Sequence, residues 1–371
     1  MHLKQSPFDT QELVHSIIWH IDHTSAQSKR DLLTCALVAR LWTYPAQSCI
    51  FRQLHWDPND ICLRWPLLRC TLDSAPYLVQ HIRRLRIFWE SIDFLDFKLF
   101  LDMCTFPFTH LEHADVSLEH AMPVQDILAV RQLFGLTTLR SVGFCWMGRS
   151  YDPELFGRLW ELCSPSIKHL ALSLHGDCHP PPKSAPRRSQ TPVIFLESLH
   201  IDNDKSLKHA LDATPFSLEQ LNKLSVASNP EPILWHSIIP SLKNVQYFAF
   251  NVEYGKRTAS IDLSLLPNLV VLGILWFNCD NDAAEPNLKV LSSINAAHQI
   301  STIIIHDGVF VSSACEELDA KLSSLPMRQP PIVVLDMDIA TSSQWRQHMP
   351  RLRSSNRLRR VVKDPECRCC R

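Results

Sequence analysis

Side chains that often do chemistry are plentiful in this chain, which has 13 cysteines and 18 histidines among its 371 residues. A tight cluster of them consists of His175, Cys178 and His179, which are residue types that bind zinc. Structural zinc sites usually show two paired ligand motifs, and no second pair accompanies this one. We therefore predict no metal site, and no cofactor.

Loops that hold phosphate or a nucleophile depend on glycine, and glycine is scarce here. The chain has 8 glycines, about a third of what average usage would give. None has the spacing of a dinucleotide fingerprint or a P-loop, and no G-x-S-x-G nucleophile elbow occurs. No spacing sets a nucleophile beside its base, so we predict no catalytic residue and a protein that is not an enzyme.

The last 26 residues form a basic segment that also contains cysteines. Residues 346–371 carry nine Lys or Arg against two acidic residues, whereas the rest of the chain carries 28 against 36. Arg368 stands where a prenylation motif requires cysteine, so Cys367, Cys369 and Cys370 are not explained by lipidation. We predict a solvated basic tail, for which binding of nucleic acid is the less favoured use.

A repeat in the chain must position whatever side chains act together. Apolar residues occur ten times with the spacing φ-x-x-φ-x-φ, at intervals of 24 to 32 residues. The last two positions of each triad lie two residues apart and therefore share one face of a short strand. The triads are Ile82-Leu85-Ile87, Leu111-Ala114-Val116, Leu139-Val142-Phe144, Ile167-Leu170-Leu172, Leu196-Leu199-Ile201, Leu221-Leu224-Val226, Val245-Phe248-Phe250, Leu269-Leu272-Ile274, Ile300-Ile303-Ile305 and Ile332-Leu335-Met337.

The segments between the triads must carry the chain back to the start of the next strand. Residues 151–163 begin with Asp152 and Pro153, which are cap and first-turn signals, and continue with helical apolar spacing. Residues 312–325 follow the same pattern. Strand and helix at a nearly fixed period predict an α/β solenoid with a parallel sheet and helical returns. An ordinary α/β domain with several parallel strands is the alternative.

Residues 8–54 do not show the repeat and are predicted to form two amphipathic helices, over 10–21 and 31–42. Asp9 with Glu12 three residues later is a capping-box signature. A module of this size lies near the lower limit for independent folding, which is roughly 40–60 residues. We therefore expect it to pack against a partner.

Two pieces of this module, FDTQELVHSIIWHI and DLLTCALVARLWTYPAQSCIFRQL, resemble the F-box-like family. The first is similar to the family's opening L-P-x-E-(I/L) helix, although Asp9 stands where the family has proline. The second is similar to its L-V-x-(R/K)-x-W core and terminal Phe-Arg. On this resemblance the residues that contact an adaptor are Phe8, Glu12, Leu13, Ile17, Leu37, Val38 and Trp42.

The repeat resembles the leucine-rich repeat family, whose period is about 20–29 residues. An F-box followed by leucine-rich repeats is a recurring architecture, and it implies a substrate-recognition subunit of an SCF-type cullin–RING ubiquitin ligase. Such a subunit docks a Skp-type adaptor, and through it a cullin, while its repeats hold a protein substrate. A leucine-rich-repeat scaffold without a ubiquitin ligase is the alternative, and an enzyme on an α/β fold is a third hypothesis.

These patterns predict an α/β protein with four parts. They are an F-box-like helical module at 1–56, a linker and capping helix at 57–78, an irregular solenoid at 79–345 with a Pro-rich loop at 179–192, and the basic tail at 346–371.

Targeting and membrane segments are not expected. Residues 13–21 are too short and too rich in histidine for a signal peptide. The apolar stretch 263–277 is broken by Pro267 and is too short to span a bilayer. We expect an intracellular protein, cytoplasmic, nuclear or both, whose cysteines are mostly reduced, buried thiols and which has no membrane partner.

Residues that alternate with the buried strand positions are expected to face a ligand. Along the solenoid they change from basic to acidic, a polarity that could orient a partner. The selected candidates are Arg84, Arg86, Phe88, Tyr247, Asp336 and Asp338. Val271, Leu275 and Ile304 fall on the same face, and as apolar residues they are expected to be covered by the C-terminal segment or a loop, or else to belong to the ligand site.

Overall fold

The fold is described from a computed structural model of the chain. It describes residues 13–14, 17–18, 26–38, 40–56, 58–89, 94–119, 124–148, 150–151, 153–174, 177–178, 193–202, 215–226, 239–250, 261–275, 288–306, 312–336 and 339–360.

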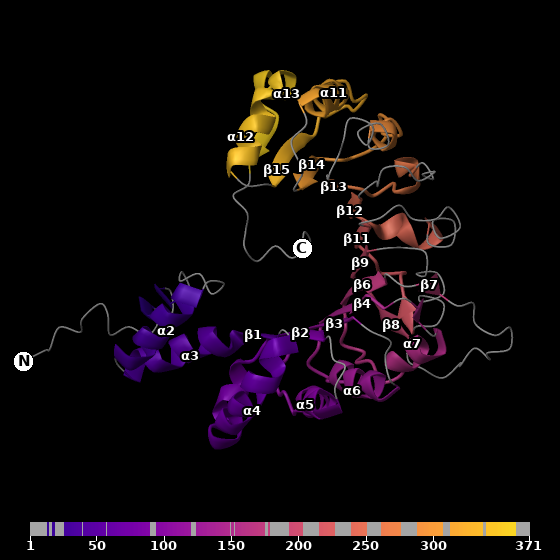
Figure 1. The fold of residues 1–371 in the computed structure, drawn as a ribbon. Helices are drawn as coiled ribbons and strands as arrows, with labels where there is room; N and C mark the ends of the chain where they lie inside the picture. The colour runs from indigo at the N-terminus through magenta and orange to yellow at the C-terminus, as the bar shows by residue number, and fades with distance from the viewer. Residues whose placement is uncertain are drawn as a thin grey trace, which may run out of the picture. The chain divides into compact units, whose positions relative to one another are not determined.

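The chain divides into two compact units. The first contains Met1–Gly148 and Arg158–Ser166, and the second contains Arg149–Gly157 and Ile167–Arg371. Four strands of the first unit and eight of the second run in chain order and pair in parallel within each unit (Figure 1). The α/β class with a parallel sheet is therefore confirmed.

The first unit opens with helices that enclose a small core. Helix α2 (Ala26–Val38) and helix α3 (Arg40–Arg52) follow a short helical segment that includes residues 13–14 and 17–18. Val14, Ile18, Leu32, Ala46 and Cys49 are buried together between them. The predicted helix 31–42 is thus wrong at both ends: residues 26–30, which contain no glycine or proline, extend it towards the N-terminus, whereas α2 ends at Val38 and residues 40–42 belong to α3.

Strands and return helices alternate through the rest of the first unit. The elements are β1 (Gln53–Trp56), α4 (Pro58–Ser74), the 3₁₀ helix η2 (Pro76–His81), β2 (Arg84–Trp89), α5 (Phe94–Cys104), β3 (His113–Leu118), α6 (Val124–Phe134) and β4 (Ser141–Trp146). Strand β1 was not expected from the sequence. It follows α3 directly and pairs with β2, so the helical module is joined to the sheet without a linker.

The second unit contains the longer run of strands. They are β6 (His169–Leu174), β9 (Ser198–Asp202), β11 (Lys223–Val226), β12 (Tyr247–Phe250), β13 (Val271–Leu275), β14 (Thr302–His306), β15 (Ile332–Asp336) and β16 (Leu358–Arg360). Two small parallel pairs lie outside this run: β5 (Ser150–Tyr151) with β7 (Asp177–Cys178), and β8 (Ile194–Phe195) with β10 (Phe216–Ser217).

Each of the ten predicted triads coincides with a strand. In nine of them all three positions are buried, and the first lies two residues before the strand begins. The tenth triad has the wrong register: Val333 and Leu335 are buried, whereas Ile332 is only half-buried. Proline precedes Ile332 in the sequence, so the apolar residue at the usual first position was missing and the pattern was read two residues late.

The segments that connect one strand to the next differ in secondary structure according to their length. The predicted helical returns are confirmed, as α7 (Pro153–Leu159) and α11 (Ser312–Ser323). The two returns between β11 and β13 are shorter, and their described residues form the 3₁₀ helices η3 (Ile239–Asn244) and η4 (Leu263–Leu265). A 3₁₀ turn uses fewer residues than an α-helix of several turns, which fits the shorter repeats.

The basic tail does not begin where the sequence predicted. Helix α12 (Ile339–Gln347), helix α13 (Pro350–Ser354) and β16 occupy residues up to 360, and β16 pairs with β15. Trp345, Met349, Leu352 and Leu358 are buried. Because these four apolar side chains are buried, the segment up to residue 360 is part of the folded unit and is not a solvated tail. Residues 361–371 and the Pro-rich loop 179–192 lie outside the described residues.

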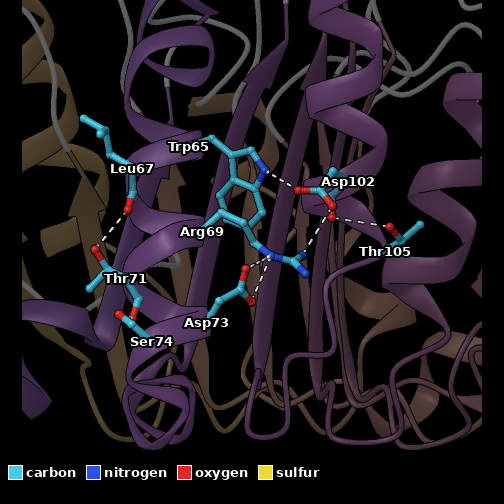
Figure 2. Close-up of polar contacts among 8 residues, drawn as sticks. All are labelled: Trp65, Leu67, Arg69, Thr71, Asp73, Ser74, Asp102 and Thr105. Atoms are coloured by element: carbon cyan, nitrogen blue, oxygen red, sulfur yellow. Dashed lines mark hydrogen bonds and ion pairs between the residues drawn. The ribbon is translucent and has the colours of Figure 1, made fainter.

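Return helices on one side of the first unit are tied together by polar contacts (Figure 2). Trp65 Nε1 on α4 donates to Asp102 Oδ2 on α5 at 2.9 Å, and Arg69 Nη1 donates to Asp102 Oδ1 at 3.3 Å. Arg69 also pairs with Asp73 one turn later, at 3.1 Å, and lies over the Phe106 ring. One arginine and one tryptophan thus fix α4 against α5.

Seven cysteines with described side chains are free thiols, and four of them, Cys49, Cys104, Cys163 and Cys315, are buried. Burial raises the pKa of the Cys163 thiol to about 12. Because the thiolate is the reactive form, this side chain acts as a small apolar residue of the core.

Buried and half-buried positions alternate along β14, so substitution of two adjacent isoleucines should cost very different amounts of stability. Ile303 is fully buried between Leu272 and Val333 of the flanking strands, whereas Ile304 is half-buried on the opposite face. Ile303→Ala should lower the free energy of unfolding by about 2–5 kcal/mol through loss of apolar contact and an internal cavity. Ile304→Ala, the matched control, should cost clearly less in urea denaturation. Equal losses would contradict the observed facing of the strand.

Candidate protein-binding surfaces

Helix α2 has two apolar sides, and only one of them is buried. Leu32 lies in the small core, fully buried. Leu33, Leu37 and Val38 are 54%, 87% and 66% exposed. Leu33 and Leu37 are four residues apart and therefore neighbours on the helix surface. We call these three residues the apolar face of α2.

Some of the residues predicted to contact an adaptor are exposed in the structure, and others pack against the rest of the module. Leu37 and Val38 belong to the apolar face of α2, and Leu13 is exposed on the preceding helical segment. Ile17 is half-buried. Trp42 is half-buried and packs against the small core, so it contributes to the module's own packing. Phe8 and Glu12 lie outside the described residues.

The sequence pattern places Leu33 on the same helix face as Leu37, although Leu33 was not among the residues selected as adaptor contacts. A stripe at i and i+4 predicts which residues share a helix face. It does not predict which face the neighbouring helices cover. The core formed with Ala46 and Cys49 of α3 decides that question, and it leaves Leu33 exposed.

Polar residues of the first unit lie on the sheet face opposite the buried strand positions. On β2, Arg86 is exposed, Arg84 and Phe88 are half-buried, and the residues between them are buried. Arg86 is aligned with Asp115 of β3, which is aligned with Gly143 of β4. A side chain at Gly143 would overlap the Asp115 carboxylate. Glycine here gives that carboxylate room to lie across β4.

A histidine in the second unit connects two of the predicted residues. His306 Nδ1 on β14 lies 2.9 Å from Asp336 Oδ2 on β15, and His306 Nε2 lies 3.2 Å from the Tyr247 hydroxyl on β12. An ionised carboxylate can only accept a hydrogen bond, so Nδ1–H donates to Asp336. With a neutral ring, Nε2 then accepts from the Tyr247 hydroxyl. His306 is only 3% exposed, and both of its nitrogens have partners.

The contact between β12 and β14 must pass over the strand between them, and Gly273 on β13 makes this possible. A Cβ at Gly273 would lie 2.7 Å from the Ala249 Cβ and 3.2 Å from His306 Nε2. On β11, the Lys223 ammonium lies 4.7 Å from the centre of the Tyr247 ring, a cation–π distance. We call Lys223, Tyr247, His306 and Asp336 the Tyr247 network.

Two separately predicted residues, Tyr247 and Asp336, are thus brought together through a third that the sequence did not indicate. His306 ends its strand at the same position that Asp336 occupies in the next repeat, which is the one signal that could have pointed to it. Asp338 lies outside the described residues. Val271 and Ile304 are half-buried rather than fully exposed.

Carboxylate, imidazole and hydroxyl in this order can orient a hydroxyl and accept its proton. In the Tyr247 network this order fixes the direction of the phenol, and Lys223 adds a positive charge over the ring. The outcome is an aromatic ring with a cation over it, held in one orientation on the sheet face.

Comparison with known proteins does not decide between functions. Neither protein-family models nor curated proteins match this sequence. Among the described residues, no group of three or more His, Cys, Asp or Glu is placed to hold a metal ion, and no helix is both long and apolar enough to cross a bilayer. His175 and His179 are not among those residues.

The Tyr247 network should behave as one coupled unit. Tyr247→Phe and Asp336→Asn each leave one nitrogen of the buried His306 with a weaker partner or none, and each should cost roughly 1–3 kcal/mol of stability. Because both act through the same ring, the double variant should deviate from additivity by at least about 0.5 kcal/mol. Urea denaturation of the cycle measures this. Strict additivity, or a loss no greater than in the Thr302→Ala control on the same strand, would contradict the network.

Proposed function

We propose that the protein is a substrate-recognition subunit of an SCF-type cullin–RING ubiquitin ligase. Its N-terminal helices would dock a Skp-type adaptor, and its sheet would bind a protein substrate. The observation that carries this proposal is the apolar face of α2, three large apolar side chains exposed beside a core that their own helix has already completed.

An exposed helix face of this kind has the geometry by which an amphipathic helix enters a partner's groove. Full burial of a leucine side chain contributes about 1.5–3 kcal/mol, and Leu37 is almost fully exposed in the free chain. A partner that covers Leu33, Leu37 and Val38 would gain several such contributions. This supports docking through α2, in agreement with the F-box-like resemblance of the sequence.

Direct connection between the helices and the sheet supports a receptor role. Strand β1 begins at Gln53, immediately after α3 ends at Arg52, and it pairs with β2 over four residues. An adaptor docked on α2 would therefore be held in a defined position relative to the first strands. A ligase needs such positioning, because the substrate must be presented at a fixed distance from the catalytic subunits.

The substrate side of the proposal draws on the Tyr247 network. Tyrosine is enriched among the residues that contribute most to binding at protein interfaces, and fixing a side chain before binding lowers the entropy cost. Tyr247 meets both conditions, Lys223 places a positive charge over its ring, and Asp336 adds a negative group nearby on the same face.

A scaffold that binds proteins without a ubiquitin ligase is the second candidate function. The observation that favours it is Asp9, which stands where the F-box-like family has proline. In a scaffold, the sheet would keep its binding role and the apolar face of α2 would contact a different partner.

Adaptor binding can be tested with the full chain and purified Skp-type adaptor. Leu37→Asp places a charge on the apolar face of α2 and should weaken binding at least about tenfold, since loss of one leucine's burial is worth more than 1.4 kcal/mol. Leu33→Asp should act in the same direction. Leu67→Asp is the matched control, because Leu67 is 70% exposed but lies on α4, and it should bind as the unaltered protein does.

Thermal unfolding of each variant shows whether it is folded. An unaltered chain that does not bind the adaptor would select the scaffold function. Adaptor binding that survives both α2 substitutions would refute docking through this face.

A further inference from the structure

A polar cavity of about 350 Å³ lies in the first unit, where the N-terminal helices meet the first strands. Helix α3 contributes Tyr44, Ser48 and Arg52 to its wall. His81 at the end of η2, Arg83 just before β2 and Glu112 just before β3 complete most of the rest. The cavity is therefore built from the docking module on one side and the start of the sheet on the other.

Positive charge predominates in this wall. Arg52 and Arg83 are held next to each other, because the backbone N–H of Arg83 donates to the Arg52 carbonyl at 3.0 Å. The acidic residue of the wall, Glu112, accepts from Arg83 Nη1 at 3.1 Å. With two arginines and one glutamate, the lining residues have a net positive charge.

His81 belongs to this wall, and one of its ring nitrogens has no hydrogen-bond partner. The side chain is only 4% exposed, and its Nε2 makes no hydrogen bond. The Tyr44 ring packs edge-on against it at 4.8 Å between centroids. Burial lowers the pKa of His81, and the charge of Arg83 lowers it further. A bound anion would offset the net positive charge of the lining residues.

We propose that this cavity binds a small molecule with two or more phosphoryl groups. Guanidinium groups recognise phosphate through paired N–H donors, and the hydroxyls of Tyr44 and Ser48 can donate as well. The cavity is also larger than one phosphate group, which favours a ligand with more than one.

Such a ligand would connect the helical module to the sheet. Arg52 and Ser48 belong to α3, whereas Arg83 and Glu112 precede β2 and β3, so one anion would contact both sides. Binding to the folded state alone stabilises it, and the thermal midpoint of the protein should rise with ligand concentration. This inference does not depend on the ubiquitin-ligase proposal, because its test needs no adaptor.

Calorimetric titration of the full chain with inorganic pyrophosphate, at constant ionic strength, tests the proposal. Pyrophosphate should bind more tightly than inorganic phosphate. Arg52→Gln and Arg83→Gln should each weaken binding at least about tenfold, the effect of losing one charged hydrogen bond. Arg86→Gln is the matched control, since Arg86 is exposed on β2 and outside the wall, and its affinity should not change.

A second variant covers the case in which loss of an arginine unfolds the protein. Ser48→Asp leaves both arginines in place and adds a negative charge to the wall, so it should weaken pyrophosphate binding with little change in thermal midpoint. No binding of pyrophosphate by the unaltered chain would overturn the proposal. Equal losses of pyrophosphate affinity in Arg86→Gln and Arg52→Gln would also overturn it, because they would indicate non-specific binding to positive charge on the protein surface.

The pH dependence of sulfate binding gives an independent test of whether His81 takes up a proton when an anion binds. Sulfate is used because its own charge does not change over the pH range of the experiment. A bound dianion should raise the pKa of His81 again, so sulfate should bind more tightly as pH falls from about 8 to about 6. His81→Gln should reduce this dependence. The other charged or titratable groups around His81 are Tyr44, Arg52, Arg83, His110 and Glu112. A pH dependence unchanged by His81→Gln would remove His81 from the site.

Discussion

A pair of backbone hydrogen bonds at the start of the strands sets the arrangement of the repeats. In seven places within the described residues, one carbonyl accepts two successive N–H groups from the next repeat, at 2.8–3.3 Å. The Asn222 carbonyl, for example, accepts from Gln246 and Tyr247. This fork fixes the register of each strand against its neighbour. A slip of one residue would exchange the buried and outward faces, so both the core and the outward side chains depend on it.

Register also explains how a polar network can form across four strands. Tyr247, His306 and Asp336 come from three repeats, yet each points to the outward face because its strand is aligned with the others. The space over β13 is open because Gly273 has no side chain. A buried histidine with an unpaired nitrogen would be costly. Asp336 on the neighbouring strand β15 and Tyr247 on β12, two strands away on the other side, each supply one partner. The network thus fixes the orientation of the Tyr247 phenol on the sheet.

The N-terminal helices differ from the repeats in that they have more apolar surface than they bury among themselves. Their core uses Leu32 and its neighbours and leaves Leu37 exposed. Strand β1 then joins these helices to the repeats by ordinary sheet pairing. At that junction Arg52 and Arg83 approach each other around a polar cavity. An exposed apolar face and a cavity whose lining has a net positive charge therefore occur in one unit.

The amino-acid sequence alone determined where most of the strands lie, because alternation of buried residues is a local property with a period of two. It also determined that α2 is amphipathic. Tertiary structure decided what each local pattern contacts: that Leu33 is exposed, that β1 extends the sheet, and that Val333 rather than Ile332 is buried. It also decided the partners of His306, which come from residues 59 positions before it and 30 after it. Spacing along a chain cannot specify such contacts, because they exist only once parallel register has brought separate repeats side by side.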